Sequence, residues 1–91
     1  MIIMSVDLGD ARTGIAASDG GENFAFPKGV IHERNKERLV AEIARYAADV
    51  SAELIVVGYP KNMDGSAGFK AKECAETAEK IRAATGLPVE L

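Results

Sequence analysis

The chain has 91 residues, a formal net charge of −3 and 47% hydrophobic residues, the size and composition of one globular domain or part of one. Its single cysteine, Cys74, excludes a disulfide framework and a cysteine-based zinc site, and it fits a reducing cytoplasm. No apolar run approaches the ~20 residues that span a bilayer, so we expect one cytoplasmic domain over residues 1–91, with no membrane partner.

The N-terminal third predicts an antiparallel meander of three strands. Residues 2–8 form an apolar run without a helical stripe, which is typical of a buried central strand. Residues 9–12 are short enough for a hairpin turn that leads into a second strand at residues 13–18. A third strand is expected around residues 27–33, at the edge of the sheet, because Pro27 cannot donate to a hydrogen-bond ladder.

A helix and a fourth strand are expected next. Asn35 is a good helix N-cap. From Lys36 to about Asp49, apolar residues recur at the i, i+3, i+4 spacing of an amphipathic helix. Residues 54–57 are wholly apolar and predict a short buried strand.

The last third repeats this order of helix and strand. Ser66 is placed to cap a second helix at about residues 67–84, and Gly86 is its expected stop. A fifth strand begins at Leu87, and the chain ends inside it. The apolar stripe of this helix is formed by Ala71, Cys74, Ala75, Ala78 and Ile81.

The predicted order is therefore β-β-β-α-β-α-β. An antiparallel meander followed by parallel strands with helical crossovers is the ribonuclease H-like α/β arrangement, here incomplete at the C-terminus. Doubly wound nucleotide-binding folds are the main competitor, but they do not usually begin with a three-strand meander.

Asp7 is the sharpest candidate for chemistry. It is a carboxylate in an apolar strand, and a buried carboxylate is costly unless it binds a metal, accepts several hydrogen bonds or projects into a polar cleft. The alternative is a strand-end aspartate that caps the turn at Gly9. The bare pattern leaves both interpretations open, because unusual carboxylates mark functional sites only statistically.

Two segments resemble motifs of the YqgF/RuvX family, which is related to Holliday-junction resolvases of the RuvC type. Residues 7–16 read Asp-Leu-Gly-Asp-Ala-Arg-Thr-Gly-Ile-Ala, and residues 57–66 read Val-Gly-Tyr-Pro-Lys-Asn-Met-Asp-Gly-Ser. The second segment departs from the family pattern only at Tyr59. A third match is the Ala-Phe-Pro of residues 25–27, and the resemblance covers the whole chain. The first motif is matched at Asp7, Gly9, Arg12, Gly14, Ile15 and Ala16.

The resemblance implies a metal-dependent nuclease that hydrolyses phosphodiester bonds in structured nucleic acid. The implied role is processing of the small-subunit ribosomal RNA precursor, and so ribosome biogenesis, or Holliday-junction cleavage; RNA and branched DNA both stay open. Such chemistry needs hard oxygen ligands for Mg²⁺ or Mn²⁺. Asp7 corresponds to the first acidic ligand of the family, so it is the predicted catalytic and metal-binding residue.

Four further residues are candidates for substrate binding. Arg12 could reach a phosphate, or could pair with Asp10 or Asp19. Lys61 and Asn62 lie in the second motif, where their alternative is ordinary turn chemistry. Ser66 begins a helix that could hold an anion, and its alternative is a plain N-cap.

The chain departs from the family at its end. The remaining acids of the family follow the fifth strand, and this chain stops at Leu91 before them, so we expect it to be inactive alone. An unfinished sheet predicts self-association through an exposed edge or swapped elements. Two other functions stay open: a fragment of an actin-like ATPase or sugar kinase, and a non-catalytic nucleic-acid-binding module.

Overall fold

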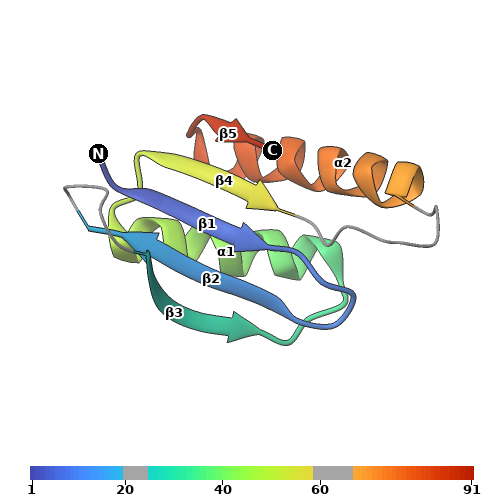
Figure 1. Cartoon of the computed structure of the whole chain (residues 1–91), viewed down its shortest axis with the longest axis horizontal. Helices are drawn as coiled ribbons and strands as arrows, with labels where there is room; N and C mark the ends of the chain where they lie inside the picture. The colour runs from blue at the N-terminus through green and yellow to red at the C-terminus, as the bar shows by residue number, and fades with distance from the viewer. Residues whose placement is uncertain (20–24, 59–66) are drawn as a thin grey trace.

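The computed structural model describes residues 1–19, 25–58 and 67–91, and the predicted order of elements is confirmed (Figure 1). The five strands form one sheet in the order β3-β2-β1-β4-β5. β1 pairs antiparallel with β2 and parallel with β4, so the chain makes a meander and then crosses over. The elements are β1 (Ile3–Asp7), β2 (Thr13–Ser18), β3 (Ala25–Ile31), α1 (Lys36–Val50), β4 (Leu54–Gly58), α2 (Ala67–Thr85) and β5 (Val89–Glu90).

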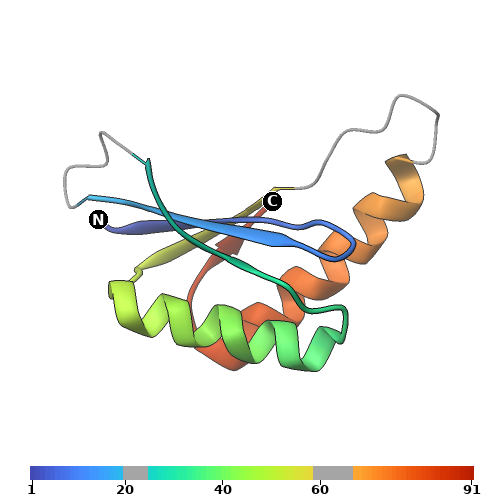
Figure 2. The same cartoon turned by 90° about the horizontal axis from the view of Figure 1, so that it is seen from below.

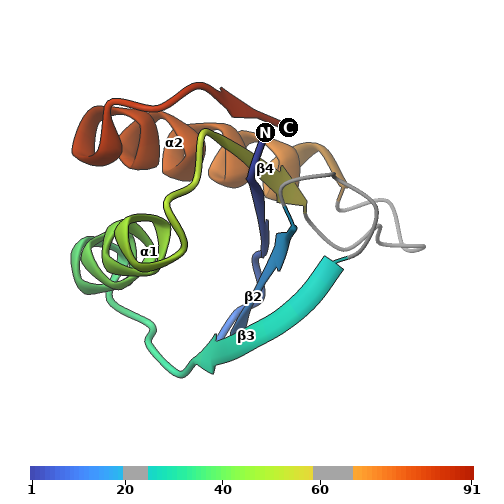
Figure 3. The same ribbon diagram turned by 90° about the vertical axis from the view of Figure 1, so that its left-hand side faces the viewer.

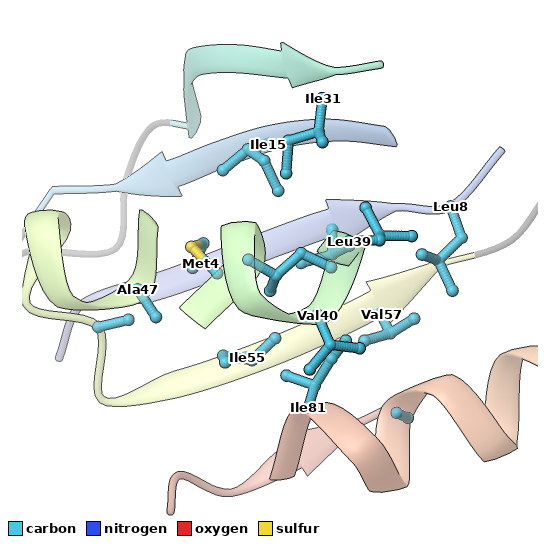
Figure 4. Packing of buried hydrophobic residues seen from close by; sticks show 14 of the residues in the cluster. Met4, Leu8, Ile15, Ile31, Leu39, Val40, Ala47, Ile55, Val57 and Ile81 are labelled. Carbon is cyan, nitrogen blue, oxygen red and sulfur yellow. The ribbon is translucent and has the colours of Figure 1, made fainter. Parts of the chain in front are cut away.

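Both helices lie on the same face of the sheet, as the two side views show (Figures 2 and 3). Side chains from this face and from the helices form one apolar cluster, in which strand residues such as Met4 and Ile55 face α1 (Figure 4). The buried members of the cluster are Met4, Val6, Leu8, Ile15, Ile31, Leu39, Val40, Ile43, Ala47, Ala52, Ile55, Val57, Cys74, Ala78 and Ile81.

The opposite face of the sheet is where the prediction for the first strand was wrong. We expected β1 to be a buried central strand; it is central, but Ser5 and Asp7 are exposed while Met4 and Val6 are buried. The reason is that successive side chains of a strand alternate between faces, and both helices cover the same face. The sheet therefore has a covered face and an open face.

The third strand lies at the edge of the sheet, as predicted, but it begins and ends two residues earlier than expected. Pro27 lies inside it, next to an irregularity in the pairing with β2 between Ile15 and Ala16. The strand ends before His32 because the chain turns there towards α1. The Glu33 carboxylate accepts a hydrogen bond from the backbone N–H of Asn35 at 3.1 Å in this turn.

The first helix begins and ends as its sequence predicts. The Asn35 side chain accepts a hydrogen bond from the N–H of Arg38 at 3.0 Å, which confirms the N-cap. At the other end Ser51 adopts the left-handed conformation, and its N–H donates to the carbonyls of Ala47 and Ala48. The buried face consists of Leu39, Val40, Ile43 and Ala47.

The second helix confirms most of its predicted stripe. Cys74, Ala78 and Ile81 are buried, but Ala75 is exposed and Thr77 is buried in its place. Positions i, i+3, i+4 and i+7 from Cys74 form one narrow face, and Ala75 lies outside it. The Thr77 hydroxyl is tolerated there because it donates to the Glu73 carbonyl at 2.9 Å.

The end of α2 lies where the sequence predicts it. Gly86 follows α2 with φ of +71°, a conformation that L side chains rarely adopt, so the predicted stop is confirmed. The predicted cap Ser66 and the stripe residue Ala71 fall outside the described side chains. No helix in the described part of the chain is long and apolar enough to cross a membrane.

Candidate functional site

Asp7 is the last residue of β1, and the pairing of its neighbours decides where it points. After Asp7 the chain stays in register for one more residue, because the N–H of Leu8 donates to the carbonyl of Gly58 at 3.1 Å. Val6 and Leu8 are both buried among the helices. Strand alternation then holds the Asp7 side chain on the open face, where it is exposed.

Glycines flank Asp7 on both neighbouring strands. Its partner on β2 is Gly14, and its partner on β4 is Gly58. Paired residues share a face of the sheet, so no side chain stands beside Asp7 in either direction. The carboxylate therefore projects from a bare strip of backbone on the open face, at the end of the central strand β1.

No hydrogen bond or ion pair to the Asp7 carboxylate is formed within residues 1–19, 25–58 and 67–91. The alternative role of capping the turn after β1 has no hydrogen bond to support it there. The turn is tight for another reason, since a Cβ at Gly9 would collide with the carbonyl oxygen of Arg12. Among the described residues, Asp7 is thus an accessible acceptor that backbone pairing positions.

Arg12 lies in the turn between β1 and β2, one residue before Thr13. Its side chain is exposed and makes no ion pair with any residue that the structure describes. The predicted pairing with Asp10 or Asp19 is therefore not seen. The guanidinium is available to a phosphate at the same end of the sheet as Asp7.

Two further arginines near this turn were missed by sequence reasoning. Thr13 pairs with Ile31, so the β1–β2 turn lies beside the connection from β3 to α1 (Figures 1 and 2). That connection carries Arg34, and Arg38 follows in the first turn of α1; both are exposed and make no ion pair among the described residues. The sequence could have indicated this neighbourhood. In an antiparallel pair of strands, the turn that enters β2 and the connection that leaves β3 lie at the same end of the sheet.

A surface cavity of about 410 Å³ adjoins the connection from β3 to α1. It is bounded by the end of β3 and by α1, and Arg38 contributes to its wall. The single histidine, His32, lines this cavity and is exposed. The cavity is lined by Val30, Ile31, His32, Glu33, Arg38, Ala41, Glu42 and Tyr46.

The described side chains provide only some of the oxygen ligands that a hard divalent ion needs. A carboxylate oxygen such as that of Asp7 is a preferred ligand of Mg²⁺ or Mn²⁺. In the described part of the chain, however, no three His, Cys, Asp or Glu side chains are grouped to hold a metal ion. The candidate substrate-binding residues Lys61, Asn62 and Ser66 lie outside the described residues. Asp7 therefore fits as one ligand of an ion whose other ligands it does not itself supply.

Comparison with known sequences finds one family over the whole chain. Residues 1–91 match the family model described as "RuvX: Holliday junction resolvase". A protein of Anaeromyxobacter sp. with the name "Putative pre-16S rRNA nuclease" is 41% identical over 91 residues, which are all of this chain and 66% of that protein. A protein of the same name from Lachnospira eligens is 42% identical, and 67% of it is covered. The chain thus spans about two thirds of the length of these relatives.

Comparison with solved structures confirms the ribonuclease H-like fold. Thermus thermophilus RuvC in complex with a Holliday junction substrate superposes with a TM-score of 0.68 at 14% identity, covering 98% of this chain and 62% of RuvC. A ROK hexokinase from the same organism gives the same TM-score at 24% identity, covering 100% of this chain and 33% of the hexokinase. The fold alone therefore does not separate a nuclease from a sugar kinase, and the sequence family carries that distinction.

Proposed function

Because this chain belongs to the RuvX family of Holliday junction resolvases, we propose that it is the N-terminal part of a metal-dependent nuclease that cleaves structured nucleic acid. The observation that carries the proposal is the exposed Asp7 carboxylate, which has no partner within the described residues and is flanked by Gly14 and Gly58. An accessible carboxylate on bare backbone leaves room for an ion and for a bulky phosphate.

In this proposal Asp7 is one oxygen ligand of Mg²⁺ or Mn²⁺. When bound, such ions polarise a phosphodiester and activate water for its hydrolysis. The part of Asp7 is to hold an ion at the end of β1, in an orientation fixed by the pairing of Leu8 with Gly58. The remaining ligands would come from beyond residue 91, so we propose that the 91-residue chain does not cleave nucleic acid alone.

The proposed substrate is structured RNA or branched DNA. The relatives' name points to the precursor of 16S ribosomal RNA, and the RuvC structure holds a Holliday junction. Arg12 would bind a backbone phosphate near the scissile bond, because a guanidinium pairs bidentately with phosphate. Lys61, Asn62 and Ser66 are proposed as further substrate contacts on the strength of the sequence motif at residues 57–66 alone.

Cleavage by a completed chain tests the proposal. Residues 1–91 would be joined to the C-terminal third of the Anaeromyxobacter relative, and Mn²⁺-dependent cleavage of a 16S precursor RNA and of a four-way DNA junction would be measured. We expect cleavage by the chimera and none by the 91-residue chain. Asp7→Asn should reduce the rate by at least about 100-fold, because a direct metal ligand matters at least as much as the groups that orient such ligands.

Asp49→Asn is the matched control. Asp49 is an exposed aspartate near the end of α1, and it should be replaceable without effect on cleavage. A chimera that cleaves equally well with Asn at position 7 would remove Asp7 from the mechanism. Binding of ATP with Mg²⁺ in calorimetry would instead favour the kinase-like alternative.

We also propose that the chain self-associates in the cytoplasm through its exposed edge. On the edge strand β3, Phe26 is 47% exposed and Val30 is 53% exposed, and an open strand edge with apolar side chains recruits partners. Light scattering at rising protein concentration should show dimers or larger species. Replacing both residues with Thr should shift the distribution towards monomers, and an unchanged distribution would contradict a role for this edge.

A further inference from the structure

Four glycines in the described strands and turns differ in what an added Cβ would meet. At Gly9 a Cβ would collide with the carbonyl oxygen of Arg12, and at Gly29 with the hydroxyl of Tyr46. Gly9 is therefore required by the backbone of its own turn, and at Gly29 the Tyr46 side chain would have to move. Gly14 and Gly58 are different, because among the described residues a Cβ there would find only ordinary van der Waals contacts.

The distances show how much room remains. Among the described residues, the heavy atom nearest to a Cβ at Gly14 would be Cβ of Asp7 at 3.8 Å, and the one nearest to a Cβ at Gly58 would be the carbonyl oxygen of Val6 at 4.0 Å. The backbone does not require glycine either, since Gly86 is the one glycine with positive φ in the described part of the chain. Glycine weakens a strand interior. Gly14 lies inside β2 and Gly58 is the last residue of β4, so Gly14 in particular is unexpected where the described neighbours impose no need for it.

What the two positions share is Asp7. Both pair with it, on opposite sides and on the open face. The strands are roughly 4.8 Å apart, so the bare strip around the carboxylate is on the order of 10 Å wide. One row further along the same strands, Ala16 and Val56 restore side chains on both sides of Ser5.

We infer that Gly14 and Gly58 are space-keeping residues, which leave the surface beside Asp7 free for a hydrated divalent ion and the phosphate it binds. This inference rests on the proposed function, because it takes Asp7 as a metal ligand. The inference adds that the affinity of the site for the ion depends on two glycines, which have no side chain to contact the ion. Glycine at these positions makes the strands less stable, and it leaves the Asp7 carboxylate accessible to an ion.

The first test is thermal stability without metal. Gly14→Ala places a methyl group where the backbone and the neighbours both accept it, so the Tm should rise by about 2 to 6 °C. A fall in Tm would show that the strand needs glycine for its own structure, and it would overturn the inference. This measurement requires neither metal nor activity.

The second test is residue-specific broadening of amide NMR signals by Mn²⁺, which detects weak binding to the 91-residue chain. Broadening should centre on Asp7 in the wild type and disappear in Asp7→Asn. Gly14→Val and Gly58→Val should each weaken binding about tenfold, comparable to the loss of a group that supports a metal ligand. Ala16→Val, on the same strand and face but one row away, should leave binding unchanged.

The outcomes distinguish the space-keeping role from the metal site itself. If broadening centres on Asp7 but survives in both glycine variants, the space-keeping role is wrong and the metal-binding role of Asp7 stands. The same conclusion follows if Ala16→Val is as damaging as Gly14→Val. If neither the 91-residue chain nor the chimera shows broadening at Asp7, or if Asp7→Asn keeps the broadening, the metal site is wrong, and with it the proposed function.

Discussion

Thr13 lies opposite Ile31 in the pairing of β2 with β3, and its hydroxyl is fully buried without a hydrogen-bond partner among the described residues. An unsatisfied buried hydroxyl costs about 1–3 kcal/mol. Thr13→Val removes the hydroxyl and nearly keeps the shape, so it should raise the unfolding free energy by about 1 kcal/mol. Urea denaturation monitored by circular dichroism measures this change.

Thr77→Val is the matched control for Thr13→Val. The Thr77 hydroxyl is also buried, but it donates to the carbonyl of Glu73 at 2.9 Å. Its removal should stabilise less than the removal at Thr13, or should destabilise. If both variants shifted the unfolding free energy equally, the missing partner of Thr13 would have no energetic meaning.

Arg12→Gln should change how nucleic-acid binding depends on salt. A phosphate contact releases condensed counterions, so its loss should reduce the slope of log K against log salt by about 0.7–0.9. Fluorescence anisotropy with a structured RNA at several salt concentrations gives the slope. Arg45→Gln is the control, because the Arg45 guanidinium already pairs with Glu42 at 2.6 Å on α1. Equal slopes for wild type and Arg12→Gln would exclude a phosphate contact.

Ile81 joins α2 to the core and is fully buried. Ile81→Ala should lower the unfolding free energy by about 2–5 kcal/mol, because it removes buried methyl groups and leaves a cavity. Ile81→Val, with one methylene fewer, should cost about 0.5–1.5 kcal/mol. Chemical denaturation of both variants checks the ratio. Ala83→Gly on the exposed side of α2 tests whether helix propensity explains the loss, since it should cost about 1 kcal/mol.

Arg82 donates side-chain hydrogen bonds to the carboxylate of Glu79, and this contact lowers the pKa of Glu79 below its ordinary value of 4.5. A lowered pKa in the folded state means stability that is present above the unfolded pKa and lost as the pH falls through the folded one. Both side chains are exposed, so the contribution to stability is small. An NMR titration should show the pKa of Glu79 rise in Arg82→Gln. Lys80→Gln removes a nearby charge without the hydrogen bond, so a rise of equal size there would exclude the hydrogen bond as the main cause.

Local sequence was sufficient for most of the elements. The cap at Asn35, the stop at Gly86 and the apolar stripe from Leu39 to Ala47 depend on residues within one or two turns of each other. The prediction that Ala75 belongs to the buried stripe was wrong, because a stripe of small residues does not indicate where the narrow buried face of α2 ends. Thr77 took its place, since a helix carbonyl satisfies its hydroxyl.

Some features of the candidate site likewise follow from local sequence, and others depend on the tertiary structure. Sequence by itself determined that Asp7 lies in a central strand, because an apolar run of β-branched residues is a local property. Only the tertiary structure decided that both helices pack on one face, that Gly14 and Gly58 flank the carboxylate, and that the turn carrying Arg12 lies beside the connection carrying Arg34. These relationships join residues that are far apart along the chain, and strand register and helix packing set them rather than any short pattern of residues.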